Sequence, residues 1–342
     1  MKKKICVIFT GGTIGSNTHG NRVSLSGESK KMLIEKYHQQ MGHDISFDEL
    51  SPVNILSENV QPSDLNKLYA CAKGVNTDKY DGIIITHGTD TLCFTVNWFS
   101  QVFCESDKPI VFVSALYPLT DPRSNGMDNF IGAVDFIESG APGGVYCAFK
   151  NDGENCRIHL GSRLIYPEEI SGFYRSALNA HFAEVYDGKV EYNQSPFVPT
   201  VEEVRNNKGV NCDPHISGGV MLITMRSLLN FAVYDFTDVR PKAVIVELSH
   251  SGTVCTKGDN GNFIKFAEYC KKCGVDVIIG PVMSRAGVYS SMKDLPAHVK
   301  ISYDLTIEMT LVKVMAAVGA GLASDAYFKD NRAFELIPYP VK

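Results

Sequence analysis

The strongest constraint on the fold of this chain is a short run of β-branched residues that ends in a polar turn. Residues 80–92 read YDGIIITHGTDTL. This pattern predicts a buried strand, a loop at its C-terminal end and then an amphipathic helix. Ligands bind at such loops in open parallel sheets. Because the loop carries a hydroxyl beside a carboxylate, Thr89 and Asp90, we consider it a candidate site.

A second stretch near the start of the chain has the same pattern. Residues 5–15 read ICVIFTGGTIG, an apolar strand followed by two glycines and Thr13. A threonine hydroxyl is a weak nucleophile that needs a base and donors for an oxyanion, and loops at strand ends can supply both. Thr13 or Thr89 alone is more simply explained as a helix cap. Together with Asp90 the two threonines form a candidate catalytic group.

Strands and helices alternate along the N-terminal half of the chain. Strands are expected at 52–56, 108–114 and 143–149, and helices at 30–39, 62–73, 91–102 and 129–138. This alternation predicts an α/β fold with a parallel sheet that is covered by helices on both faces.

The pattern fails between residues 186 and 214, where prolines and an Asn-Asn-Lys-Gly run occur. It resumes with strands near 220–224, 243–247 and 275–279 and helices near 263–272 and 307–318. We therefore predict two α/β domains joined by a connection. The ranges are 1–190 for the larger, catalytic domain, 191–215 for the interdomain connection and 216–342 for the smaller domain.

Composition narrows the class of partner and the compartment. The 342 residues carry a formal net charge of −5, which gives no indication of nucleic acid or an anionic membrane as a partner. No apolar stretch approaches the length that spans a bilayer. The apolar run after Lys2–Lys4 is too short for a signal peptide. The ten cysteines are scattered, some within apolar runs, as in a reducing cytosol. We expect a cytoplasmic protein.

Other motifs give weaker indications. The Gly11–Gly15 turn could hold a phosphate, but it lacks the G-x-G-x-x-G spacing and the later acidic residue of a dinucleotide site. Cys270 and Cys273 have no second pair, so they read as incidental cysteines. His87 reads as a structural hydrogen-bonding residue, with a catalytic base as the alternative. The polar segment 16–29 is either a mobile lid or an ordinary surface loop.

Two motifs together resemble a known family. Thr10-Gly11-Gly12-Thr13-Ile14-Gly15 and His87-Gly88-Thr89-Asp90-Thr91 are similar to the paired signatures of the bacterial-type L-asparaginase/glutaminase family, and the resemblance runs over nearly the whole chain. Ser57-Glu58-Asn59, Ser124–Asn129 and Asn260-Gly261-Asn262 resemble further segments of that family. The short N-terminus is more like its cytoplasmic type.

The resemblance implies hydrolysis of an amino-acid amide through a covalent acyl-enzyme. It makes Thr13 the nucleophile, and it places Thr89 in a relay with a lysine and Asp90 or makes it an alternative nucleophile. It implies the substrate contacts as well. Main-chain N–H groups near Thr89 and Gly12 hold the oxyanion, and Gly88 is a further substrate-binding position. Ser57 binds the α-carboxylate, Glu58 and Asp90 bind the α-ammonium, and Asn262 contacts substrate from the second domain. No metal or organic cofactor is implied, and a homodimer or homotetramer is expected.

Some positions depart from the family pattern. By position in this resemblance, Arg163 stands where the relay lysine is expected, Arg22 replaces the lid tyrosine, and Arg285 lies where a neighbouring protomer contacts substrate. Arginine stays protonated in proteins, so it can orient a group or stabilise charge but cannot shuttle a proton. Glu58 in place of glutamine is the choice of members that also accept glutamine.

The first hypothesis is therefore an amidohydrolase that acts on L-asparagine, with a relaxed preference that extends to L-glutamine. A relative that acts on a different amide is the alternative that Arg22 and Arg163 favour, because an arginine can pair with an extra carboxylate or phosphate. A non-catalytic amino-acid binder that kept Ser57, Glu58 and Asp90 but lost the relay is the alternative outside enzymes.

Overall fold

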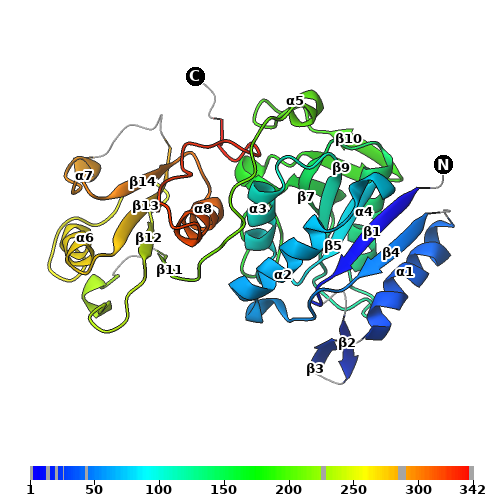
Figure 1. Ribbon diagram of the computed structural model, residues 1–342, viewed down its shortest axis with the longest axis horizontal. Coiled ribbons are helices and arrows are strands. Elements are labelled where there is room, and N and C mark those ends of the chain that lie inside the picture. Colours follow the sequence, from blue (N-terminus) through cyan, green and yellow to red (C-terminus); the bar gives the residue numbers. More distant parts are fainter. Residues whose placement is uncertain are drawn as a thin grey trace. The chain divides into compact units, whose positions relative to one another are not determined.

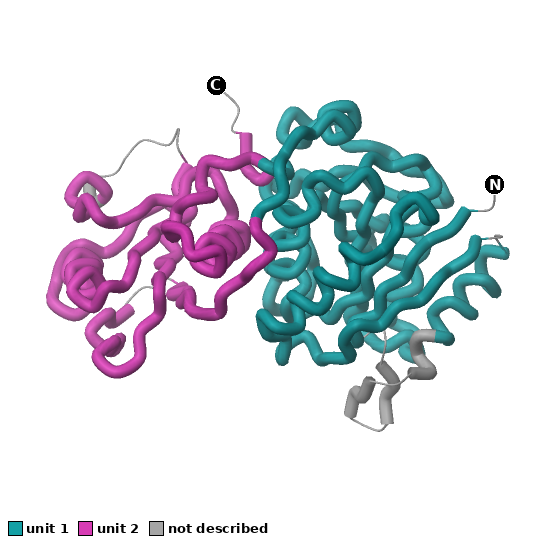
Figure 2. Tube along the Cα trace, viewed as in Figure 1, with its two compact units in different colours: residues 1–212, 332–334 teal, residues 213–331, 335–342 magenta. Residues whose placement is uncertain are grey.

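The computed structural model describes residues 3–12, 16–19, 22–25, 27–42, 45–224, 229–283 and 290–338, with side chains described outside 13–30 and 284–291. The chain forms two compact units (Figure 2). Unit 1 contains residues 1–212 and 332–334, and unit 2 contains residues 213–331 and 335–342.

Unit 1 is built on a mixed eight-stranded sheet with the order β10-β9-β8-β7-β6-β5-β1-β4 (Figure 1). Neighbours from β4 to β7 run parallel, and neighbours from β7 to β10 run antiparallel. The change at β7 follows from the connection, because only residues 151–155 separate β7 from β8 and a parallel crossover needs a dozen or more. The strands are β1 Lys4–Phe9, β4 Ser46–Leu50, β5 Gly82–Thr86, β6 Pro109–Val113, β7 Gly144–Lys150, β8 Cys156–Leu160, β9 Ala183–Tyr186 and β10 Lys189–Tyr192.

Helices cover both faces of this sheet, as the sequence predicts. Tyr37 of α1 and Phe130 of α4 contact each other in the core on one face. Phe99 of α3 packs edge-on against Phe112 of β6, whose side chain points to the opposite face. The helices of unit 1 are α1 Gly27–Met41, α2 Pro62–Lys73, α3 Leu92–Val102, α4 Gly126–Glu138 and α5 Val201–Arg205. A separate hairpin pairs β2 Ser16–His19 with β3 Arg22–Leu25.

The central strands are apolar on both faces. In β1, Ile5 to Phe9 are at most 1% exposed, and β5 and β6 are buried along their full length. Such strands give a rigid base whose C-terminal ends carry loops. The two strands that the sequence analysis identified as carriers of the site, β1 and β5, lie side by side and parallel.

One predicted strand is wrong. Residues 52–56 form no strand, and only Ile55 makes an isolated bridge, to Gly11. The strand next to β1 is β4, which lies at the sheet edge and reads SFDEL. An edge strand with charged residues lacks the apolar signal on which the prediction relied.

The structure also gives the elements within the predicted connection at 191–215. This range contains the end of β10 and all of α5, which begins with a capping box between Thr200 and Glu203. Unit 1 extends to Cys212.

Unit 2 has a four-stranded parallel sheet with the order β11-β12-β13-β14. The strands are β11 Val220–Ile223, β12 Ala243–Glu247, β13 Asp276–Val282 and β14 Lys300–Tyr303, and the helices are α6 Phe263–Lys272, α7 Ser290–Lys293 and α8 Ile307–Gly319. A short 3₁₀ helix, η6, spans Phe231–Val233. Over the described ranges, no helix has the length and hydropathy to cross a bilayer.

A buried ion pair holds the end of the chain in unit 2. Nζ of Lys313 on α8 lies 2.7 Å from Oε1 of Glu335, and both side chains are at most 1% exposed. The same ammonium donates to the carbonyls of Tyr327 and Asp330, at 2.8 Å each. A buried charge needs such partners, because desolvation is costly.

We predict that Lys313→Met lowers the free energy of unfolding by about 3 to 5 kcal/mol, because it removes the buried ammonium that pairs with Glu335. Urea denaturation of the full chain measures this, and Glu335→Leu added to Lys313→Met should recover part of the loss. Lys67→Met, which removes an exposed pair with Asp64, is the control and should change stability by less than about 1 kcal/mol. If Lys313→Met and Lys67→Met changed the free energy of unfolding equally, the stabilising role of the buried Lys313–Glu335 pair would be contradicted.

Candidate active site

The turns after β1 and β5 touch through their backbones. Gly12 has φ +76°, and a Cβ at this position would lie 2.5 Å from the nitrogen of Gly88 and 2.7 Å from its Cα. An L side chain is disfavoured at this φ and would also collide with the neighbouring main chain. Gly12 therefore lets the two candidate loops approach to contact.

A third segment joins them from residues 54–59. The amide of Ile55 donates to the carbonyl of Thr10 at 2.9 Å, and a Cβ on Gly11 would lie 2.6 Å from the carbonyl oxygen of Ile55. This contact fixes the 3₁₀ helix η2, Ser57–Asn59, beside the loop after β5. A Cβ on Gly88 would lie 2.4 Å from Oγ of Ser57.

Ser57 and Asp90 form the polar centre of the site. Oγ of Ser57 donates to Oδ2 of Asp90 at 2.5 Å and accepts from the amide of Asp90 at 3.2 Å. The carbonyl of Ser57 accepts from Oγ1 of Thr91 at 3.0 Å. Ser57 is 4% exposed, whereas Asp90 is exposed. Within the described residues no group bonds Oδ1 of Asp90, so this oxygen is open to a cationic ligand.

The hydroxyl of Thr89 is available on the same turn. Thr89 is half-buried, and the parts of the chain that the structure describes offer its Oγ1 no hydrogen-bond partner. Its carbonyl is held by Oη of Tyr174, which donates at 2.6 Å. An open hydroxyl on a firmly held backbone suits nucleophilic or proton-transfer chemistry.

The sequence analysis did not identify Tyr174. Its ring is fully buried and lies 4.6 Å from the ring of Phe149. Asn151, at the end of β7, donates to the carbonyl of Tyr174 at 3.0 Å and accepts from its amide at 2.9 Å. Asn151, directly after the C-terminal end of β7, thus fixes the backbone of Tyr174, and the Tyr174 hydroxyl in turn fixes the carbonyl of Thr89. The sequence contains no local signal for this role, since the contact spans 85 positions.

His87 has a structural role at the end of β5. Its Nδ1 lies 2.8 Å from the carbonyl oxygen of Gly88, so this nitrogen carries the proton and donates. Its own carbonyl accepts from Oγ of Ser114 at 2.7 Å. The side chain is 2% exposed, and burial lowers its pKa. These contacts favour the structural interpretation over the catalytic base.

Arg163 is held by backbone carbonyls. It lies in the 3₁₀ helix η4, Gly161–Arg163, and is 3% exposed. Its Nε donates to the carbonyl of Phe334 at 2.5 Å, and its Nη1 donates to the carbonyl of Phe197. These bonds attach residues 332–334 to the rest of unit 1, together with Ser162, which donates to the carbonyl of Ala333 at 2.5 Å. The contacts give Arg163 a structural role.

The other predicted site residues are placed as follows. Glu58 is exposed on η2, next to Ser57. Asn262, in unit 2, caps α6, because its Oδ1 accepts from the amides of Ile264 and Lys265 at 3.0 and 3.2 Å. Thr13 lies outside the described residues, and so do Arg285 and the side chain of Arg22.

The Ser124–Asn129 segment organises the next loop of the sheet. Asn125 accepts from the amide of Leu116 at 3.0 Å and donates to the carbonyl of Lys150 at 2.8 Å. Asn129 donates to the carbonyl of Ser114 at 2.8 Å and accepts from the amide of Lys150 at 2.6 Å. The two amides therefore join the ends of β6 and β7. Over the described residues, no cluster of three or more His, Cys, Asp or Glu side chains could hold a metal.

This chain is similar to known proteins over most of its length. Residues 4–198 match the N-terminal domain of asparaginase. An L-asparaginase of Thermococcus kodakarensis is 27% identical over 328 residues, covering 92% of this chain and 93% of that protein. The structure of the thermostable L-asparaginase from the same organism aligns with a TM-score of 0.80 at 24% identity, over 98% of this chain and 100% of that one.

A second group of relatives carries a different name. A glutamyl-tRNA(Gln) amidotransferase subunit of Pyrococcus abyssi is 25% identical over 359 aligned positions, covering 98% of this chain and 77% of that protein. The match to the N-terminal domain covers more than half of the chain. The chain belongs to the asparaginase family of amidohydrolases.

The burial of His87 predicts a pH dependence of stability. The folded pKa lies below the unfolded value of about 6.5, so the unfolded chain binds a proton that the folded chain does not. The contribution of His87 to stability is therefore complete above about pH 6.5 and is lost as the pH falls below that value. Urea denaturation at pH 7 and pH 5 should show a smaller acid-induced loss in His87→Gln than in the exposed control His250→Gln. Equal losses would mean that His87 is protonated in the folded chain.

Proposed function

We propose that this chain is a cytoplasmic amidohydrolase that converts L-asparagine to L-aspartate and ammonia and accepts L-glutamine as a second substrate. The observation that carries the proposal is the turn at residues 88–91. It presents the open Oδ1 of Asp90 and the open hydroxyl of Thr89 at the contact between the loops after β1 and β5. Membership of the asparaginase family supports the same reaction class.

Recognition of a free amino acid needs groups of both signs. Asp90, with Glu58 beside Ser57, supplies negative charge for the α-ammonium, and a charge-assisted hydrogen bond to Oδ1 is strong. We assign the α-carboxylate to Ser57. The Ser57 hydroxyl donates to Asp90, so substrate binding must redirect that proton to the carboxylate. Because Ser57 contacts both Asp90 and the α-carboxylate, binding of the carboxylate changes the hydrogen bonding of the group that binds the ammonium.

The proposed chemistry is acyl transfer through a threonine ester. The hydroxyl oxygen of Thr13 attacks the amide carbon, the carbon–nitrogen bond breaks, and ammonia leaves with the hydroxyl proton. Water then adds to the ester and releases the acid and the threonine hydroxyl. Main-chain N–H groups of Gly12, Gly88 and Thr89 are the proposed donors to the oxyanion. Thr89 is the alternative nucleophile.

Proton transfer is assigned to Thr89 and Asp90 rather than to Arg163. Arg163 remains charged, and its guanidinium donates to carbonyls, so it has no part in the proposed relay. Asp90 directly follows Thr89 and is fixed by Ser57 through Oδ2. With Oδ1 of Asp90 bonded to the ammonium, the hydroxyl of Thr89 can accept the proton of the nucleophile and donate its own to the departing nitrogen.

The relatives that are glutamyl-tRNA(Gln) amidotransferase subunits favour a second candidate function, release of ammonia from an amide for transfer to another molecule. Under this alternative the chain would act on L-glutamine and need a partner for full activity. The proposed asparaginase acts alone, as a homodimer or homotetramer. Ammonia release from L-asparagine by the purified chain favours the first proposal, and release from L-glutamine alone favours the second.

We predict that Thr13→Val and Thr89→Val each lower the rate of ammonia release from L-asparagine by about a thousandfold or more, because each removes a hydroxyl at nearly constant side-chain volume. A coupled ammonia assay measures this. The control is Thr77→Val on a separate 3₁₀ helix, Thr77–Lys79, which should leave the rate unchanged. Full activity of Thr13→Val would rule out Thr13 as nucleophile.

Tyr174→Phe should lower kcat by about tenfold and leave KM nearly unchanged, because it frees the backbone of Thr89 without touching the groups that bind the charged ends. Steady-state ammonia release with L-asparagine separates the two constants. Tyr303→Phe, at an exposed position of unit 2, is the control. A rise in KM alone would mean that Tyr174 serves binding rather than the position of Thr89.

A further inference from the structure

Unit 2 contains a pocket whose lining includes Asn262, the N-cap of α6, and otherwise none of the residues assigned to the proposed hydrolysis. It has a volume of about 320 Å³ and lies among η6, the turn at residues 259–262 and helix α6. This volume is at the lower end of the range for small-molecule sites, roughly 300 to 1,000 Å³. Every residue that lines it belongs to unit 2.

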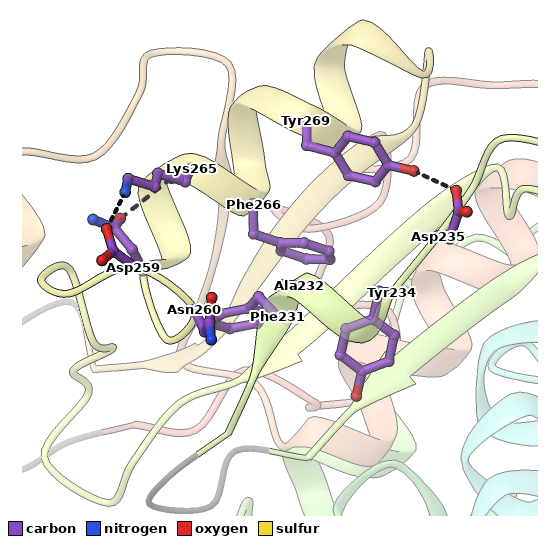
Figure 3. Close-up of a pocket in the computed structure, with 10 residues that line it drawn as sticks. Phe231, Ala232, Tyr234, Asp235, Asp259, Asn260, Lys265, Phe266 and Tyr269 are labelled. Carbon is purple, nitrogen blue, oxygen red and sulfur yellow. Dashed lines mark hydrogen bonds and ion pairs between the residues drawn. The ribbon is translucent and has the colours of Figure 1, made fainter.

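The floor of the pocket is aromatic (Figure 3). The rings of Phe231 and Phe266 stack with centroids 4.7 Å apart and an interplanar angle of 19°. Both are at most 3% exposed, so the core of unit 2 fixes them. Tyr234, whose ring lies 5.8 Å from that of Phe266, and Tyr269 are half-buried and form the walls. The two tyrosine rings, which are half-buried, offer apolar area and negative π faces to a ligand above this floor.

Asp235 supplies a fixed carboxylate beside this floor. Its Oδ1 accepts from Oη of Tyr269 at 3.1 Å, from the amide of Thr237 at 2.9 Å and from the hydroxyl of Thr237 at 2.5 Å. These bonds lower the pKa of Asp235, so the group is ionised at neutral pH. Within the described part of the chain, Oδ2 has no hydrogen-bond partner. Oδ1 of Asp235 therefore already accepts three hydrogen bonds, whereas Oδ2 is available to bind a ligand.

The remaining charges leave the pocket negative. Asp259 is paired with Nζ of Lys265 at 2.9 Å, so these two charges compensate each other. Figure 3 shows this pair and Asp235 on opposite sides of Phe266. The net charge of the lining residues therefore comes from Asp235 and is negative.

We propose that this pocket binds a small organic ammonium ion that carries an apolar body. The body lies against the half-buried rings of Tyr234 and Tyr269, and the ammonium contacts Oδ2 of Asp235. A single open oxygen suits the compact ammonium, whereas a guanidinium fork needs two carboxylate oxygens in line. An anion is disfavoured by Asp235, and a neutral ligand leaves Oδ2 without a charge partner.

The test is isothermal titration calorimetry of the full-length protein with benzylamine, and with benzyl alcohol as the neutral analogue of nearly the same shape. We expect saturable binding of benzylamine at one site per chain and binding of benzyl alcohol that is weaker by at least about tenfold, the loss of one charge-assisted contact. Equal binding of the two compounds, or no saturable binding of benzylamine, would overturn the proposal.

Matched variants locate the site. Asp235→Asn keeps an oxygen for the bonds from Thr237 and Tyr269 but removes the charge, so benzylamine should bind about tenfold more weakly. Asp238→Asn changes the same charge three positions away, outside the lining residues, and should bind as the unmodified chain does. Tyr234→Leu should also weaken binding. Equal affinities of Asp235→Asn and Asp238→Asn for benzylamine would mean that the amine binds elsewhere and would contradict the proposal. If a second copy of the chain closes the pocket, no heat of binding appears at any amine concentration, and that result also contradicts the proposal.

Discussion

The backbone contact between Gly12 and Gly88 is the constraint on which the candidate active site depends. A Cβ at Gly12 would lie 2.5 Å from the nitrogen of Gly88, so only glycine lets the loops after β1 and β5 meet. The rigid parallel strands below bring the two loops to the same edge of the sheet. The bond between Ile55 and Thr10 adds the third loop, with Ser57. Three segments that are far apart in the sequence thus converge within hydrogen-bonding distance.

The same site shows how one carboxylate can be both fixed and available. Ser57 holds Asp90 through Oδ2 and through its amide, while Oδ1 stays open. The two carboxylate oxygens of Asp235 in unit 2 differ in the same way. Oδ1 accepts three hydrogen bonds, and Oδ2 accepts none from the described residues. Preorganised carboxylates of this kind bind a cation without first losing the freedom of their own side chain. The surroundings of the two carboxylates differ, with polar turns around Asp90 in unit 1 and aromatic rings beside Asp235 in unit 2.

Local patterns in the sequence predict much of this structure. The apolar runs of β1 and β5 and the glycines that follow them predict buried strands and close loops, and α2, α6 and β12 begin and end where the sequence indicates. Long-range contacts are beyond such patterns. Tyr174 reaches Thr89 across 85 positions, and the guanidinium of Arg163 bonds the carbonyl of Phe334 across 171 positions. The position of Arg163 in a motif therefore suggested a relay, whereas its contacts hold the C-terminal segment. The edge strand β4 was missed because its outward-facing polar residues weaken the periodic signal.

The central claim is that the turn at residues 88–91, with Ser57, binds the charged ends of a free amino acid. A crystal structure of the protein with L-aspartate, the product of the proposed reaction, tests it most directly. The account predicts the α-ammonium within hydrogen-bonding distance of Oδ1 of Asp90, the α-carboxylate at Ser57, and the side-chain carboxylate toward Thr89 and Gly12. Aspartate bound with its ammonium away from Asp90, or an empty turn at saturating aspartate, would contradict the account.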